Sequence, residues 1–464
     1  MTNQDTICAI STAPGSGGIA VIRISGPEAI SISNNLFVPR VAGKDLLSQK
    51  AYTLRYGSIK RGEELIDDVL VALFKGPHSF TGEDTIEITC HGSIYIQQQI
   101  LQLLIENGCR SALPGEYTQR AFMNGKMDLS QAEAVADLIA STSAGQHKLA
   151  LSQMRGGFSN ELRELREQLL HITSLMELEL DFSDHEVLEF ADRSELTHLA
   201  SHIENVISRL AHSFSVGNAI KNGIPVAIIG ETNAGKSTLL NVLLNEEKAI
   251  VSDIHGTTRD VIEDTVNIQG ITFRFIDTAG IRETHDTIES IGIERTFQKL
   301  TQANIVLWMI DSTEAIQQIE QLSEKILPLC QEKQLILVFN KADLLTEPID
   351  KLPFNLPQNV QKLFISAKKK DNIQELQELL IEAAHLPSLS QNDVIVTNVR
   401  HYEALTHALD AIHRVQEGLN IGLSGDFVSQ DLRECLSHLA EIVGGAFDVE
   451  DVLGNIFKHF CIGK

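Results

Sequence analysis

The sequence predicts a multidomain protein that combines α/β parts with an all-helical part. Three observations predict this class. Residues 1–122 mix β-rich and helical segments, apolar residues recur at helical spacing on both sides of the chain's centre, and residues 221–386 carry short apolar strands that lead into polar motifs. We expect an N-terminal α/β domain, a helical bundle built from residues 123–220 and 387–464, and a doubly wound α/β domain inserted between the two halves of the bundle.

Hydrophobic spacing predicts the elements of the first and last parts. Residues 18–24, 68–74 and 85–90 are β-rich, and residues 94–106 place apolar side chains at helical spacing. Apolar residues that recur at helical period then predict the helices of the bundle. These stripes of residues are Leu165, Leu169, Ile172 and Met176; Leu196, Leu199, Ile203, Val206, Leu210 and Phe214; Tyr402, Leu405, Leu409, Ile412 and Leu419; Val428, Leu432, Cys435, Leu439 and Ile442; and Val449, Val452, Ile456 and Phe460.

Composition narrows the function classes. The chain has 464 residues with 43% hydrophobic content, which is enough for about three domains with real cores. A net charge of −24 argues against broad electrostatic attraction to a polyanion. Because the chain has no apolar run of membrane-spanning length and no signal peptide, we expect a cytoplasmic protein that makes no use of a membrane. Its six cysteines lack C-x-x-C pairs, so neither a disulfide framework nor a zinc site is indicated.

The strongest motif is GETNAGKS at residues 230–237, which fits the phosphate-binding loop G-x-x-x-x-G-K-[ST]. It follows the apolar residues 226–229 and precedes the apolar helical run 239–244, the context that the motif requires. Backbone N–H groups and a helix N-terminus would hold the phosphates, with Lys236 supplying a positive charge and Ser237 a hydroxyl for Mg²⁺. The alternative is a glycine-rich turn that only caps a helix.

Three later motifs favour a guanine nucleotide over that alternative. Residues 277–280 (DTAG) follow a strand and place a carboxylate near Mg²⁺ and an N–H near the γ-phosphate. Residues 340–343 (NKAD) place Asp343 at the base, where it can accept from two N–H groups of guanine and so discriminate by about a hundredfold or more. Residues 366–368 (SAK) form a turn suited to the guanine carbonyl.

Between the first two motifs, residues 256–260 (GTTRD) form a loop that can fold over Mg²⁺ and the γ-phosphate, with Thr258 as a Mg²⁺ ligand. The motifs together predict a Ras-like P-loop GTPase domain that uses GTP and Mg²⁺. Ile281 follows the DTAG motif, so the water-orienting glutamine of Ras-like proteins is absent. The residues expected at GTP are Asn233, Ala234, Gly235, Lys236, Ser237, Thr238, Ser252, Asp253, Ile254, His255, Gly256, Thr257, Thr258, Asp277, Thr278, Ala279, Gly280, Asn340, Lys341, Asp343, Ser366, Ala367 and Lys368.

Five further motifs carry a resemblance to a known family. They are FTGED (residues 80–84), PGEYTQRAF (114–122), KMDLSQAE (126–133), GTTRD and the terminal CIGK (461–464). Together they resemble the family of tRNA-modification GTPases called MnmE or TrmE, from end to end. GTTRD by itself also resembles the ribosome-assembly GTPases Era and Der, so the N-terminal motifs and the tail are the specific part.

The resemblance implies a homodimer with a folate-binding N-terminal domain and a GTPase activated by K⁺. It implies Asn233, Ser252, Ile254 and Thr257 as K⁺ ligands, and Glu289 as the residue that positions the attacking water. The implied partner is the flavoprotein MnmG (GidA), which carries FAD and forms a heterotetramer with the dimer. The pair installs a carboxymethylaminomethyl or aminomethyl group at C5 of the wobble uridine of certain tRNAs, with 5-formyl- or methylene-tetrahydrofolate as the one-carbon source.

The same resemblance implies Arg23, Glu83, Lys126 and Lys464 as folate contacts. A carboxylate can accept paired donors from a pterin edge, and cations suit the anionic glutamate tail. Cys461 is either a proton donor or redox group, or it packs beside the folate. Two other functions stay open from the residues alone: a regulatory GTPase of ribosome assembly without modification chemistry, and a folate enzyme with a vestigial switch, which the intact nucleotide motifs disfavour.

Overall fold

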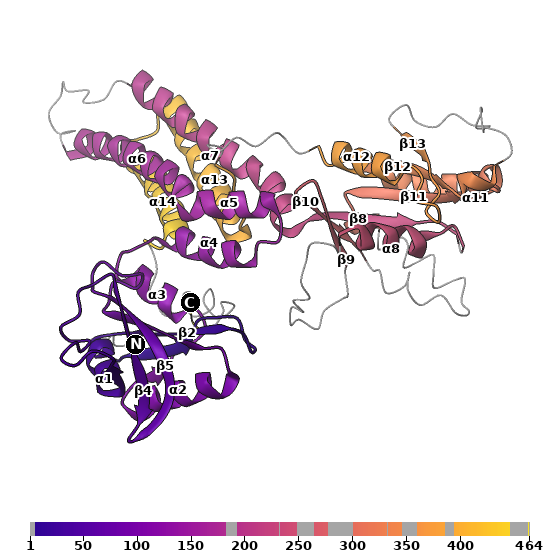
Figure 1. Ribbon diagram of the computed structural model, residues 1–464. Helices are drawn as coiled ribbons and strands as arrows, with labels where there is room; N and C mark the ends of the chain where they lie inside the picture. The colour runs from indigo at the N-terminus through magenta and orange to yellow at the C-terminus, as the bar shows by residue number, and fades with distance from the viewer. Residues whose placement is uncertain are drawn as a thin grey trace. The chain divides into compact units, whose positions relative to one another are not determined.

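The computed structural model describes residues 5–181, 193–231, 233–247, 264–276, 300–331, 333–345, 360–385, 394–445 and 463 (Figure 1). The chain divides into two compact units. The first consists of residues 1–140, 150–209 and 403–464, and the second of residues 141–149 and 210–402. Because the first unit resumes after the second, most of the second unit is inserted within the sequence of the first, as expected for the doubly wound domain.

The first unit begins with a seven-stranded sheet in the order β3-β4-β5-β6-β2-β1-β7. Its strands are β1 Ile7–Ile10, β2 Ile19–Ser25, β3 Phe37–Pro39, β4 Thr53–Arg61, β5 Glu64–Phe74, β6 Thr85–His91 and β7 Arg110–Ser111. All neighbours are antiparallel except β1 and β7. Helices α1 Ala29–Leu36 and α2 Ile94–Glu106 contribute Ile32, Ile100 and Leu104 to the core on one face. The predicted β-rich segments and helix are confirmed.

The next elements are helical. They are α3 Glu116–Met123, α4 Leu129–Ala140, α5 Ala144–Met154, α6 Gly157–Asp181, α7 Arg193–Asn222, α13 Val399–Ile421 and α14 Gly425–Val443. The predicted stripes are mostly buried: Leu165, Leu169, Ile172 and Met176 lie inside α6, and Val428, Leu432, Cys435, Leu439 and Ile442 inside α14. Helices α6 and α14 pack against each other. The stripe predicted at residues 449–460 lies outside the described residues.

The second unit contains a six-stranded sheet in the order β13-β12-β11-β8-β10-β9. Its strands are β8 Ile224–Ile229, β9 Asp264–Ile268, β10 Ile271–Phe275, β11 Ile305–Asp311, β12 Gln334–Asn340 and β13 Gln361–Phe364. Only the β9–β10 pair is antiparallel. Helices α8 Lys236–Glu247 and α12 Ile373–Ala383 cover one face and α11 Ala315–Ile326 the other, because they contribute to different core clusters. The doubly wound class is therefore confirmed.

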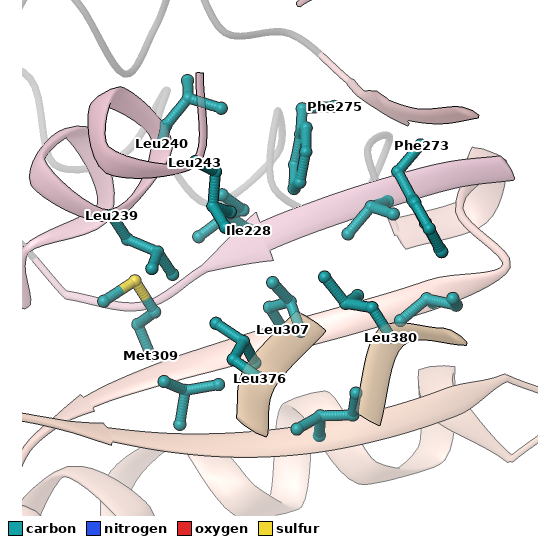
Figure 2. Close-up of a cluster of buried hydrophobic side chains, with 14 of the residues drawn as sticks. Ile228, Leu239, Leu240, Leu243, Phe273, Phe275, Leu307, Met309, Leu376 and Leu380 are labelled. Atoms are coloured by element: carbon teal, nitrogen blue, oxygen red, sulfur yellow. The ribbon is translucent and has the colours of Figure 1, made fainter. Parts of the chain in front are cut away.

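Side chains from α8, α12 and the central strands form one core on the first of these faces. Figure 2 shows Leu239 and Leu243 of α8 and Leu376 and Leu380 of α12 directed toward the sheet. Strand β11 is buried along its whole length, which suits a central strand of a parallel sheet covered on both faces. This core fixes the carboxyl ends of β8, β11 and β12, where ligands bind in such sheets.

Five cysteines, Cys8, Cys90, Cys109, Cys330 and Cys435, are buried thiols, as expected of small apolar side chains. Within the described helices, none is both long and apolar enough to cross a bilayer.

Candidate nucleotide site and N-terminal ion cluster

The phosphate-type loop joins the end of β8 to the start of α8, which is the strand–loop–helix context that the sequence predicted. Two glycines make the loop possible. Gly230 and Gly235 have positive φ angles of 146° and 96°. A Cβ at Gly235 would lie 2.1 Å from Nδ2 of Asn340, and a Cβ at Gly230 would lie 2.3 Å from the carbonyl oxygen of Met309. Only glycine fits such close approaches.

Lys236 opens α8 and bends over the loop. Its Nζ donates hydrogen bonds to the carbonyl oxygens of Gly230 and Glu231, both at 2.7 Å. These neutral acceptors hold the ammonium at the helix N-terminus. The helix dipole favours negative charge at this same place, as a phosphate would supply. A phosphate oxygen is a stronger acceptor than a carbonyl, so the ammonium can exchange these contacts for a phosphate.

Asn340, at the end of β12, ties the motifs together. Its Nδ2 donates to the carbonyl oxygen of Ala234 at 2.8 Å, and its Oδ1 accepts from the backbone N–H of Ala367 at 2.9 Å. The side chain is buried, so both bonds are protected from water. One amide thus fixes the spacing between the phosphate loop and the two loops predicted to hold the base, a role that the motif alone did not indicate.

Asp343, the carboxylate predicted to read the base, lies in the short helix that follows β12. Its Oδ1 accepts a hydrogen bond from Oγ of Ser366 at 2.8 Å, and its Oδ2 lies 3.4 Å from Nζ of Lys369. The hydrogen bond from Ser366, followed by the interaction with Lys369, holds the pKa of the Asp343 carboxyl below its usual range. The carboxylate is therefore ionised at neutral pH and is an acceptor only, as recognition of the guanine N–H edge requires.

Lys341 is a left-handed residue with φ 62° whose ammonium pairs with Oδ2 of Asp311 at 2.5 Å. Burial alone would raise the pKa of Asp311, but the hydrogen bonds from Lys341 and Thr313 outweigh it and lower that pKa. The sequence analysis missed Asp311. A carboxylate at the end of the apolar strand β11 was the available signal, since parallel strands of one sheet end along a common edge.

The motifs surround a cavity of about 480 Å³. Its lining is Asn233, Gly235, Lys236, Ser237, Thr238, Asn340, Lys341, Asp343, Leu344, Ser366 and Lys368. A larger cavity of about 640 Å³ lies beside Ile224, Ile305 and Gln334, at the amino ends of the strands, which is the wrong edge for a nucleotide in this fold. Several predicted site residues lie outside the described part of the chain: Ser252, Asp253, Ile254, His255, Gly256, Thr257, Thr258, Asp277, Thr278, Ala279, Gly280, Glu289, Cys461 and Lys464.

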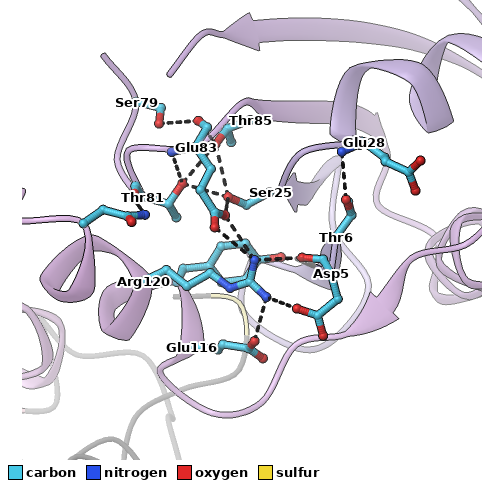
Figure 3. Close-up of polar contacts among 12 residues, drawn as sticks. Asp5, Thr6, Ser25, Glu28, Ser79, Thr81, Glu83, Thr85, Glu116 and Arg120 are labelled. Atoms are coloured by element: carbon cyan, nitrogen blue, oxygen red, sulfur yellow. Dashed lines mark hydrogen bonds and ion pairs between the residues drawn. The ribbon is translucent and has the colours of Figure 1, made fainter. Parts of the chain in front are cut away.

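A second polar centre lies beside the N-terminal sheet, and we call it the Arg120 cluster: Asp5, Glu83, Arg110, Glu116 and Arg120. Figure 3 shows Asp5, Glu83 and Glu116 around Arg120. The Arg120 side chain is 5% exposed, and one of its nitrogens lies 3.1 Å from Oε2 of Glu83. The other terminal nitrogen bonds Oδ1 of Asp5 at 2.9 Å and Oε1 of Glu116 at 3.0 Å. A buried guanidinium thus joins three carboxylates.

Arg110 closes the cluster from the other side. It bonds Oε1 of Glu116 at 2.6 Å and Oδ2 of Asp5 at 2.7 Å. Burial would raise the pKa of Glu116, but the hydrogen bonds from Arg110 and from the N–H of Leu113 outweigh it, so the pKa lies below its usual range. The sequence analysis quoted the segment that carries Glu116 and Arg120 only as a family motif. Their i,i+4 spacing was the signal of an ion pair on one helix face.

The predicted folate residues gather around residues 76–84. Arg23 pairs with Glu87 at 2.8 Å, and its guanidinium lies 5.8 Å from the ring centre of Phe80. Glu83 belongs to the Arg120 cluster. Nζ of Lys126 donates to the carbonyl oxygen of Pro77 at 2.7 Å.

The fourth predicted residue, Lys464, lies outside the described residues, but its neighbour Gly463 is in contact with the N-terminal sheet. The carbonyl oxygen of Gly463 accepts from Oγ of Ser11 at 2.9 Å. A Cβ at Gly463 would lie 2.3 Å from the carbonyl oxygen of Ile10. Gly463 therefore packs closely beside the end of β1.

Comparison with known proteins gives consistent results along the chain. Residues 6–126 match the family model of the N-terminus of the GTP-binding protein TrmE, and residues 129–461 match that of the MnmE helical domain. The tRNA modification GTPase MnmE of Bacteroides thetaiotaomicron is 70% identical over 100% of both chains. That of Parabacteroides distasonis is 71% identical over 99% of this chain and 100% of its own. The structure of Era from Aquifex aeolicus bound to GDP and AlF4⁻ covers 40% of this chain and 66% of its own, at 30% identity and a TM-score of 0.27.

Proposed function

The chain belongs to the family of tRNA modification GTPases called MnmE, so it is a GTP-hydrolysing enzyme of tRNA modification, and we propose that it couples GTP turnover to a folate site in its N-terminal domain. The GTP-binding part of this proposal rests on the cavity at the carboxyl ends of β8 and β12. This cavity brings Lys236 and Ser237 together with Asp343. We further propose that the modification is a carboxymethylaminomethyl or aminomethyl group at C5 of the wobble uridine.

In this proposal each described motif has one task at the nucleotide. Asp343 accepts from guanine, Lys236 contacts the phosphates, and Ser237 supplies a hydroxyl to Mg²⁺, which offsets charge on the phosphates when bound. Asn340 keeps the base and phosphate subsites at a fixed spacing through its bonds to Ala234 and Ala367. Thr258 as a Mg²⁺ ligand and Glu289 as the water-positioning residue remain proposals for the part of the chain outside the described residues.

We also propose activation by K⁺ through Asn233, with Ser252, Ile254 and Thr257 as further ligands. Asn233 supports this proposal because it lines the nucleotide cavity and has a left-handed backbone with φ 69°. Its amide oxygen is a suitable ligand for a hard cation, and a bound K⁺ would offset charge that develops on the transferred phosphoryl group. GTP turnover measured in KCl and in NaCl tests this: we expect it to fall in NaCl, and equal rates would contradict it.

For the folate site the support is the convergence of Arg23, Glu83 and Lys126 around residues 76–84. Phe80 and Tyr117 add aromatic faces, since the guanidinium of Arg23 lies 5.8 Å and 5.7 Å from their ring centres. The contact of Gly463 with Ser11 supports a role for the adjacent Lys464. Cys461, two residues earlier in the sequence, stays a proposed neighbour of the folate. The ligand in this proposal is 5-formyl- or methylene-tetrahydrofolate.

Calorimetric titration of 5-formyl-tetrahydrofolate into the full-length protein tests this assignment. We expect Arg23→Ala to weaken binding, because it removes a cation placed over two aromatic rings. Arg40→Ala, a charge change in the loop after β3, is the matched control and should bind as the unchanged protein does. Equal affinities of all three proteins would remove Arg23 from the site.

The proposed partners are tRNA, a second copy of the chain and the FAD-carrying flavoprotein MnmG, all in the cytoplasm. Exposed apolar side chains on β2, β4 and β5 support a dimer through the open face of the N-terminal sheet: Ile19, Leu54, Tyr56 and Leu70 are 65%, 66%, 49% and 42% exposed. The alternative of a ribosome-assembly GTPase is the weaker one, because the relatives that match the full length are tRNA modification GTPases.

A further inference from the structure

Glu83 depends on a single cation. Among the described residues, Arg120 is the only basic side chain within ion-pair distance of Glu83, whereas Asp5 and Glu116 each pair with both Arg110 and Arg120. The Arg120 cluster contains three carboxylates and two guanidinium groups, so it carries one excess negative charge. Because Glu83 shares its only cation with two other carboxylates, that excess is concentrated at Glu83.

We propose that Arg120 is a positioning residue, which fixes the plane of the Glu83 carboxylate so that its Oε1 accepts an N–H group of a bound ligand. This inference rests on the proposed folate function. It adds how the carboxylate is held and which of its oxygens receives the ligand.

The hydrogen bonds to Glu83 occupy its two carboxylate oxygens unequally. An ionised carboxylate has about four lone-pair positions. Arg120 uses one on each oxygen, at 3.2 Å and 3.1 Å, and Oγ of Ser25 uses a second on Oε2 at 2.8 Å. One position is therefore left on Oε1 and none on Oε2, so Oε1 is the oxygen that can accept an N–H of a ligand.

The Ser25 hydroxyl has a second partner within reach. Its Oγ lies 2.7 Å from Oγ1 of Thr81, and either oxygen can be the donor. If Thr81 is the donor, the Ser25 O–H stays directed at Oε2 of Glu83, so Thr81 supports the hydrogen bond that occupies this oxygen. Oε1 is then the oxygen that can accept a ring N–H, as on the pterin of a folate.

The orientation of Arg120 is fixed from behind. One terminal nitrogen also donates to the carbonyl oxygen of Asp5 at 2.9 Å, and the other bonds Asp5 and Glu116. A guanidinium is planar, so these contacts also fix the edge that meets Glu83. A lysine at this position would keep the charge, but its single ammonium could not hold both oxygens of Glu83 and the three acceptor atoms of Asp5 and Glu116.

A double-mutant cycle in the full-length protein tests the inference, with 5-formyl-tetrahydrofolate as the titrated probe. We expect Arg120→Lys to raise Kd about tenfold, about 1.4 kcal/mol. In a Glu83→Gln background the same change should raise Kd less than about twofold, because Arg120 acts through the Glu83 carboxylate. Arg40→Lys is the matched control: it makes the same change at an exposed arginine outside the Arg120 cluster, and its Kd should stay within about twofold of the unchanged protein.

Three results would overturn the inference when the unchanged protein binds the folate: an unaltered Kd in Arg120→Lys, an equal loss in both backgrounds, or a loss in Arg40→Lys as large as that in Arg120→Lys. Thermal unfolding verifies that each variant is folded. If Arg120→Lys does not fold, Glu116→Gln replaces it in the cycle, since it releases Arg120 on one side only. Absence of folate binding by the unchanged protein would instead reject the folate proposal together with this inference.

Discussion

Two carboxylates, Asp343 in the nucleotide site and Glu83 in the bend before β6, have the same side-chain exposure of 13% but are held in different ways. Asp343 is held by the hydroxyl of Ser366 and a nearby lysine, both close to it in the base-binding loops. Glu83 is held by the buried guanidinium of Arg120, which is itself held by two more carboxylates. Support from nearby loops leaves a carboxylate whose function its own motif predicts, whereas the buried ion pairs of Arg120 join distant parts of the chain.

Disrupting the Asn340 contacts in the nucleotide site should have the largest effect, a loss of GTP affinity. Gly235→Ala places a Cβ 2.1 Å from Nδ2 of Asn340 at a backbone angle φ of 96°. Left-handed strain and displacement of the buried amide bridge together cost roughly 4 kcal/mol, so we expect GTP affinity to fall about a thousandfold. Binding of a fluorescent GTP analogue measures this.

Gly62→Ala is the control for that change. Gly62 also has a positive φ of 62°, but no atom lies within 4 Å of an added Cβ. It should therefore show the backbone strain without the clash, and GTP affinity should be unaltered. Equal losses in the two variants would show that the Asn340 contact is not what makes glycine necessary at position 235.

The second largest effect should come from the base-reading carboxylate itself. Asp343→Asn replaces one acceptor by a donor, so we expect the preference to move from GTP toward xanthosine triphosphate by about a hundredfold. Competition between the two nucleotides measures the ratio. Asp371→Asn, a change in the adjacent loop, should keep the preference for GTP, and an unaltered ratio in Asp343→Asn would refute the assignment.

On the N-terminal side, Gly463→Ala tests whether the end of the chain completes the folate site. A Cβ there would lie 2.3 Å from the carbonyl oxygen of Ile10, at a φ of 98°, so we expect the contact with Ser11 to open and folate affinity to fall about tenfold. Calorimetric titration measures the affinity. Gly445→Ala, whose Cβ would meet only Ala440 at 3.7 Å, should bind normally. Normal binding by Gly463→Ala would separate the tail from the site.

The smallest effect concerns the pH dependence of the Arg120 cluster. The pKa of Glu116 is depressed in the folded chain, so its contribution to stability is present above its usual pKa of about 4.5 and is lost as the pH falls through the lower folded value. Glu116→Gln should destabilise the N-terminal sheet by about 1.5 kcal/mol at pH 7, and the difference should shrink below pH 4.5. Hydrogen exchange of residues 110–123 measures it, and a difference independent of pH would contradict the ion-pair explanation.

The fold class and much of the nucleotide site were predictable because their signals are local. The phosphate loop needs eight consecutive residues, and Asp343 lies three residues after Asn340. The contacts missed from the sequence join separate segments: Asn340 with Ala234, Lys341 with Asp311, and Arg120 with Asp5. Their pairing depends on how strands and helices are placed, which hydrophobic periodicity leaves undetermined. The same holds for Ser25 and Glu83, which meet only after β2 pairs with β6.

The most direct test of the central claim, that Glu83 anchors a folate group used for modification, is mass spectrometry of wobble nucleosides from cells whose only copy carries Glu83→Gln. A strain with Glu63→Gln, a change in the exposed β4–β5 turn, is the control. The account predicts loss of the C5 modification of wobble uridine in the first strain and a normal profile in the second. A normal profile in the Glu83→Gln strain would contradict it.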